Sequence, residues 1–132
     1  MYPKTSRSAI GWHLVSTHLG VVITGSRYSL GVPMVFDYLH HRAYTGRGSN
    51  SAVMERALET WSGHDGRPEL HYSTQKVGTR TGAHADMIDA NDFVHFISLL
   101  PRRAVDVMLE AKTKDKALLK LRRDLRGLYE LC

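Results

Sequence analysis

The sequence has almost no cysteine, because Cys132, its last residue, is the only one. An internal disulfide framework is therefore excluded, and an intracellular, reducing compartment fits best. Long apolar runs are also missing, since none approaches the roughly 20 residues that a membrane-spanning helix needs. Residues 9–15 form a short apolar stretch that does not resemble a signal peptide. We therefore expect neither a membrane partner nor a thiol-based activity.

Acidic residues are outnumbered by basic ones, with 13 Asp/Glu against 18 Lys/Arg and a formal net charge of +5. This balance favours an anionic partner. The chain also contains 8 histidines within 132 residues, which favours metal binding because neutral imidazole is the commonest protein ligand for metals. With 42% hydrophobic residues, the chain has the composition of one small domain.

From Gly31 onward, the apolar pattern alternates between strand-like and helix-like segments. Short strands are predicted at residues 34–36, 69–73 and 105–109. Helices are predicted at residues 51–61 and 89–100, with a closing amphipathic helix that carries leucines at 118, 121, 125 and 128. A loop is predicted at residues 41–50, and residues 1–28 show no sustained period and stay unassigned. This rhythm predicts an α/β fold with a parallel sheet.

Potential metal ligands follow each of the three predicted strands. They are Asp37 with His40 and His41 after the first strand, His71 with His84 at the second, and Glu110 after the third. Because the carboxyl ends of parallel strands meet at one edge of a sheet, we expect these side chains to converge. Mixed nitrogen and oxygen ligands suit zinc, manganese or iron. The pattern therefore predicts a site for several divalent metal ions.

Each residue also has an ordinary explanation. Asp37 could cap a helix or form a turn, and one of His40 and His41 is expected to be a plain loop histidine. His71 could be a hydrogen-bonded core histidine, and Glu110 could pair with a nearby lysine. Their shared position at one sheet edge favours the metal site over these separate explanations.

Basic and polar side chains in the loops at the same edge could contact nucleic-acid phosphates. These residues are Arg42, Tyr44, Arg47, Gln75, Lys76 and Arg80. A solvated basic surface is the alternative for any one of them.

Four stretches together resemble the C-terminal part of the UV damage endonuclease family. They are GVPMVFDYLHH, PELHYSTQK, HADMID and VDVMLEAKTKDKALLKL, in this order. The resemblance implies part of a TIM-type (β/α)₈ barrel that cuts damaged double-stranded DNA on the 5′ side of UV photoproducts. It also implies a cluster of divalent metal ions, typically Mn²⁺ with Zn²⁺ or Mg²⁺ as alternatives. The family's ligands fall on Asp37, His40, His71, His84 and Glu110.

The sequence departs from the family pattern at Glu69, where the family often has a carboxylated lysine. A glutamate there could supply a similar negative charge, so Glu69 is predicted to take part in catalysis. Residues 29–132 account for only about three βα units, so we expect an incomplete barrel that a second chain could complete. Two alternative hypotheses are a non-catalytic DNA-binding remnant and a fragment of a barrel related to sugar isomerases or epimerases.

Overall fold

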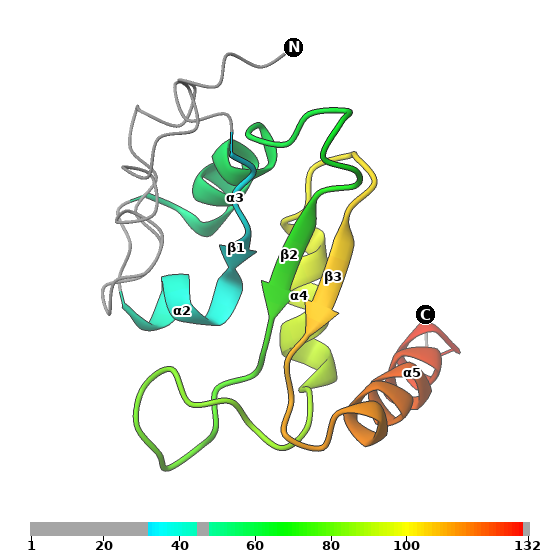
Figure 1. The fold of residues 1–132 in the computed structure, drawn as a ribbon. Helices are drawn as coiled ribbons and strands as arrows, with labels where there is room; N and C mark the ends of the chain where they lie inside the picture. The colour runs from blue at the N-terminus through cyan, green and yellow to red at the C-terminus, as the bar shows by residue number, and fades with distance from the viewer. Residues whose placement is uncertain (1–31, 45–47, 131–132) are drawn as a thin grey trace.

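The computed structural model describes residues 32–44 and 48–130, so the unassigned residues 1–28 lie outside the described part. Three parallel strands form one sheet in the order β1, β2, β3 (Figure 1). The strands are β1 (Phe36–Asp37), β2 (Glu69–Tyr72) and β3 (Asp106–Leu109). The helices are α2 (Tyr38–Ala43), α3 (Asn50–Leu58), α4 (Ala90–Ser98) and α5 (Asp115–Glu130). The predicted α/β fold with a parallel sheet is confirmed.

The strand register brings the carboxyl ends of all three strands to the same edge of the sheet. Asp37 of β1 is paired with His71 of β2, and His71 is paired with Met108 of β3. The ladder continues one step further, because the Glu110 N–H donates to the Tyr72 carbonyl at 2.9 Å. Side chains alternate along a strand, so Glu110 projects to the same face as Met108 and His71.

The opposite face of the sheet packs against helices and forms the core. Leu70 and Tyr72 of β2 are fully buried, and Phe96 of α4 contacts Tyr72 with ring centroids 4.9 Å apart. Figure 1 shows α4 behind β2 and β3, consistent with this contact. Ala117 and Leu121 of α5 join the same cluster. One face of the sheet is therefore covered, and the face that carries His71 is left for polar side chains.

A polar network links α2 and α4 across the end of this core. Tyr72 donates from its hydroxyl to Asp92 Oδ2 at 2.6 Å, and Arg42 Nη1 donates to Asp92 Oδ1 at 2.9 Å. The Arg42 guanidinium carbon lies 5.0 Å from the Tyr38 ring centroid, within the range of a cation–π contact. Asp92 of α4 therefore connects this helix to both β2 and α2.

The structure corrects several details of the predicted elements. The predicted loop at residues 41–50 is wrong in its first part, because Tyr38–Ala43 form the helix α2. The helix predicted at residues 51–61 ends at Leu58. In α5, Leu121 is buried as expected, but Leu118 is 45% exposed because it lies beside a surface cleft.

None of the helices in the described part of the chain has the length and apolar content required to cross a bilayer.

Candidate metal centre

The first part of the site is built where β1 ends and α2 begins. Asp37 is the N-cap of α2, and its Oδ1 accepts the His40 backbone N–H at 2.9 Å. Its other oxygen, Oδ2, lies 2.6 Å from His40 Nδ1. A capping carboxylate three residues before a histidine thus holds both the backbone and the ring of that histidine. Asp37 is a helix cap and also a member of the candidate site, so the two interpretations of this residue are compatible.

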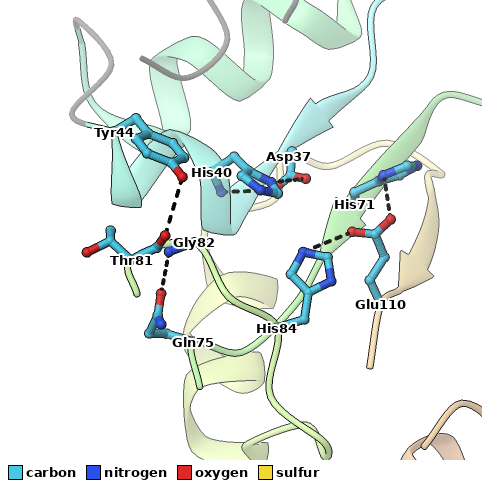
Figure 2. Close-up of polar contacts among 9 residues, drawn as sticks. All are labelled: Asp37, His40, Tyr44, His71, Gln75, Thr81, Gly82, His84 and Glu110. Atoms are coloured by element: carbon cyan, nitrogen blue, oxygen red, sulfur yellow. Dashed lines mark hydrogen bonds and ion pairs between the residues drawn. The ribbon is translucent and has the colours of Figure 1, made fainter. Parts of the chain in front are cut away.

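The second part of the site gathers around Glu110, which follows β3. Glu110 Oε1 lies 3.4 Å from His71 Nδ1, and its Oε2 lies 3.7 Å from His84 Nε2. Figure 2 shows the His71 and His84 rings directed at this carboxylate, with Asp37 at the end of β1 and His40 in α2 nearby. The His40 and His84 rings also meet edge to face, with centroids 5.6 Å apart. All five predicted ligands are therefore close together.

Asp37, His71 and Glu110 come closest to a shared coordination site. Each offers one ligand atom, and these atoms lie within 4.8 Å of one another. The three side chains are partly buried, so they are shielded from solvent without being closed off. Carboxylate oxygens combined with imidazole nitrogen are a donor set that divalent transition metals accept. The residues present therefore fit a divalent metal ion.

Glu69 adds a third carboxylate to this cluster. Its Oε1 lies 3.1 Å from His71 Nε2, so it contacts the ring nitrogen opposite the one that faces Glu110. The spacing in the sequence was sufficient to predict this contact, because the side chains of residues two apart on a strand lie on the same face. Nothing in the structure places Glu69 at a reacting group, and its predicted catalytic role stays a prediction.

The structure separates the two adjacent histidines. His41 is 3% exposed, and its Nδ1 lies 2.7 Å from Asn50 Oδ1, the first residue of α3. His40 lies in the candidate metal centre instead, where its Nδ1 contacts Asp37. Because successive helical residues point about 100° apart, only one of the two can face the site.

Hydrogen bonds from the side chains of Gln75 and Tyr44 hold the loop between β2 and α4, which carries His84. Gln75 Oε1 accepts the Gly82 N–H at 2.7 Å, and Gln75 Nε2 donates to the Lys76 and Arg80 carbonyls at 3.0 Å. The Tyr44 hydroxyl donates to the Thr81 carbonyl at 3.3 Å (Figure 2).

Tyr44 also contacts a residue of the candidate metal centre. The Tyr44 ring is stacked on His40 with an interplanar angle of 8°. Gly82 has φ +81°, and a Cβ there would lie 2.8 Å from Tyr44 Oη. Tyr44 therefore touches both the His40 ring and the turn that precedes His84.

The residues predicted to bind DNA have different surroundings. Arg42 pairs with Asp92, and Lys76 Nζ lies 3.4 Å from Asp86 Oδ1. Arg80 is exposed and lines the cleft beside His84. Arg47 lies outside the described residues. DNA contact by these residues stays a prediction.

Comparison with known proteins connects this geometry to one family. A family model described as UV-endonuclease UvdE matches residues 26–132. The UV DNA damage endonuclease of Bacillus pumilus (strain SAFR-032) is 38% identical over 103 residues, which are 74% of this chain and 32% of that protein. The UV DNA damage endonuclease of Bacillus velezensis (strain DSM 23117 / BGSC 10A6 / LMG 26770 / FZB42) is 34% identical over 101 residues, again 74% of this chain and 32% of that protein.

A solved structure, the crystal structure of SacUVDE, is similar to the described fold. It has a TM-score of 0.65 and 31% sequence identity, and the match covers 79% of this chain and 35% of that chain. The chain thus spans about a third of the length of the relatives it matches.

Proposed function

Because the chain belongs to the UV-endonuclease UvdE family, we propose that it contributes to the metal-dependent cleavage of damaged DNA on the 5′ side of UV photoproducts. The observation that carries this proposal is the convergence of Asp37, His71 and Glu110, whose ligand atoms lie within 4.8 Å of one another. His40 and His84 flank the trio through Asp37 and Glu110, respectively.

Asp37, His71 and Glu110 would hold a divalent metal ion, with Mn²⁺ favoured and Zn²⁺ or Mg²⁺ as alternatives. His40 and His84 would serve further ions in the same cluster. Asp37, Glu69 and Glu110 concentrate negative charge here, and a divalent cation offsets such charge. Asp37 keeps His40 fixed at 2.6 Å, so this imidazole enters the site already oriented.

A metal bound here would make hydroxide available near neutral pH and neutralise charge on the phosphodiester. The protein's own side chains would position the metal ligands. The α2 cap orients His40, Glu110 spans His71 and His84, and Glu69 fixes the far side of the His71 ring. Held at one sheet edge, these groups limit where a phosphate can lie relative to the metal ions.

Damaged double-stranded DNA is the partner that this function requires. Selection of a lesion would follow from extruding a poorly stacked base, which costs less at damage than in an intact duplex. We place the three βα units in a TIM-type barrel, in which another polypeptide could supply further strands. A DNA substrate also implies an intracellular site of action, in the nucleoid or the nucleus.

The experiment is a nicking assay on supercoiled plasmid with the full chain. Irradiated plasmid with Mn²⁺ should be relaxed, whereas irradiated plasmid with EDTA and undamaged plasmid with Mn²⁺ should stay supercoiled. His71→Ala should lower the nicking rate by at least about 100-fold, because it removes a ligand of the trio. His95→Ala is the matched control, since His95 is exposed on α4.

Calorimetric titration with Mn²⁺ separates this function from its alternatives. Binding that disappears in His71→Ala but persists in His95→Ala supports the metal centre. Metal-independent DNA binding without nicking would favour a non-catalytic DNA-binding remnant. Metal binding with no response to irradiated plasmid would favour a sugar isomerase or epimerase relative, and either result would contradict the proposal.

A further inference from the structure

We propose that Lys112 and Lys114, in the loop after β3, form a binding subsite for the DNA phosphates next to the cleavage position. This inference rests on the proposed function and deepens it, because it assigns a backbone-binding role to residues outside the metal cluster. The subsite is a cleft of about 910 Å³ that begins at the candidate metal centre. His40, His84 and Glu110 of the candidate metal centre line this cleft together with the two lysines.

The charge of the cleft suits a polyanion. Arg80, Lys112 and Lys114 contribute three cations, against the carboxylates of Glu110 and Asp115. Glu110 is already engaged by His71 and His84. Within the described residues, none of the three cations forms an ion pair, whereas Arg42 and Lys76 are each paired with an aspartate. Unpaired cations beside a metal centre are available to phosphate oxygens.

The loop that carries the lysines is held in place by its backbone. The Lys112 N–H donates to the Ala85 carbonyl at 3.2 Å, and the Thr113 N–H and hydroxyl both donate to the Asp86 carbonyl, at 3.1 and 2.6 Å. These contacts join the lysine loop to the loop that carries His84. The backbone that carries the two lysines is thus tied to the loop that carries His84.

Lys114 adopts a backbone conformation that a lysine rarely takes. Its φ is +50°, and it is the sole non-glycine residue with a positive φ in the described part of the chain. Left-handed backbone costs a side-chain-bearing residue about 1 kcal/mol or more, and such strain concentrates at functional sites. Glycine or asparagine would suit this position better on stability alone. A cation is present there instead, which points to a use for its charge.

The geometry of DNA explains why a second anion site should lie here. One strand carries a phosphate every 3.4 Å along the helix axis, so a phosphate at the metal centre has close neighbours along the strand. The cleft that His84 and Glu110 line is also lined by Lys112 and Lys114, so it offers cations to those neighbouring phosphates. Leu118, 45% exposed at the cleft wall, offers an apolar surface to the sugars.

The experiment is a salt series of DNA binding by fluorescence anisotropy. The probe is a labelled duplex with one thymine photodimer, in EDTA so that it is not cut. Lys112→Gln combined with Lys114→Asn should raise Kd by roughly tenfold per lost contact at 0.1 M salt, and should reduce the slope of log K against log salt by about 1 per lysine. Asn is chosen at position 114 because it tolerates a positive φ. Lys116→Gln is the control, since Lys116 is exposed at the start of α5 but does not line the cleft.

The outcomes separate this inference from the proposed function. A weakened affinity and reduced salt slope in the double variant, with an unchanged melting temperature and a wild-type Lys116→Gln, support the phosphate subsite. Unchanged binding by the double variant overturns the subsite, and the proposed function then still stands on plasmid nicking. Failure of the wild-type chain to bind the duplex in EDTA also overturns the subsite, whereas the proposed function is overturned only when irradiated plasmid with Mn²⁺ stays supercoiled.

Discussion

At the scale of single residues, we expect Glu69 to act as a positioning residue for His71. The two side chains share one face of β2, and Glu69 Oε1 lies 3.1 Å from His71 Nε2 while Glu110 approaches Nδ1. A carboxylate on the far nitrogen of a ligating imidazole fixes its ring and tautomer and strengthens its bond to a metal. Glu69→Ala should therefore lower Mn²⁺ affinity by about 10-fold to 100-fold in a calorimetric titration.

The control for Glu69 is Asp106→Asn on the neighbouring strand. Asp106 is the register partner of Glu69, but it pairs with Arg67 at the exposed surface. Exposed pairs of this kind contribute little to stability. Mn²⁺ affinity should stay at the wild-type value in Asp106→Asn, and the metal-free melting temperature should be similar in both variants. Equal affinity in Glu69→Ala and wild type would show that the 3.1 Å contact does not orient His71.

The residue pattern predicted the site residues whose position is set by the ends of parallel strands. It did not predict those whose position is set by the orientation of a helix. Asp37, His71 and Glu110 were found because parallel strands bring their carboxyl ends together. The residue pattern alone left open which of His40 and His41 faces the site, because that depends on α2, which was not predicted. The family resemblance selected His40. The contact between Glu69 and His71 could have been predicted from the sequence, because residues two apart on a strand lie on the same face.

At the scale of elements, the loop between β2 and α4 depends on close contact at Gly82. A side chain there meets two obstacles, because φ is +81° and a Cβ would lie 2.8 Å from Tyr44 Oη. Gly82→Ala should reduce the free energy of unfolding by about 1–2 kcal/mol from backbone strain alone, with a further loss from the Tyr44 contact. Because the turn leads to His84, Mn²⁺ affinity should fall as well.

Gly78→Ala in the same loop separates strain from contact. Gly78 has φ +71°, but no heavy atom lies within 4 Å of a Cβ built there. Its substitution should cost similar backbone strain while leaving Mn²⁺ affinity intact. Thermal melts and metal titrations of both variants provide the comparison. If the two variants lose metal affinity to the same degree, the Tyr44 contact has no special part in placing His84.

The elements themselves were predicted where periodicity was long enough to detect. The three strands and the helices α3, α4 and α5 matched their sequence patterns to within a few residues. The six-residue helix α2 was missed, because fewer than two turns give little periodic signal. Its capping signal was the carboxylate of Asp37 three residues before the N–H of His40. The contact between Tyr44 and Gly82 joins distant segments and has no local signature.

At the scale of the whole molecule, the helices of the described part cover only one face of the sheet. Leu70 and Tyr72 are buried beneath helices on this face. On the other face, Met108 is 49% exposed beside the polar side chains of the candidate site. Among the described residues, β1 and β3 each pair with β2 alone, so both outer edges of the sheet have unpaired backbone groups. Such edges invite pairing with another strand. The candidate metal centre lies on the face of the sheet that the helices of the described part leave uncovered.

The free energy of unfolding should fall at alkaline pH because of the tyrosines of the core. Burial raises the pKa of Tyr72 well above its usual value of 10, and the hydrogen bond to Asp92 raises it further. Burial also raises the pKa of Tyr38. Above about pH 10, the unfolded chain loses these protons while the folded chain keeps them, so rising pH favours unfolding.

The contribution of Tyr72 to stability should therefore be constant below about pH 9. It should then decline by up to about 1.4 kcal/mol per pH unit above pH 10. Urea denaturation between pH 8 and 11.5 measures this decline. Lysines also titrate in this range, so Tyr72→Phe isolates the tyrosine: the variant should be less stable at pH 8, and its stability should fall less steeply above pH 10. Parallel pH profiles for the two proteins would mean that Tyr72 ionises as readily in the folded chain as in the unfolded one, which its burial beneath α4 and its hydrogen bond to Asp92 oppose.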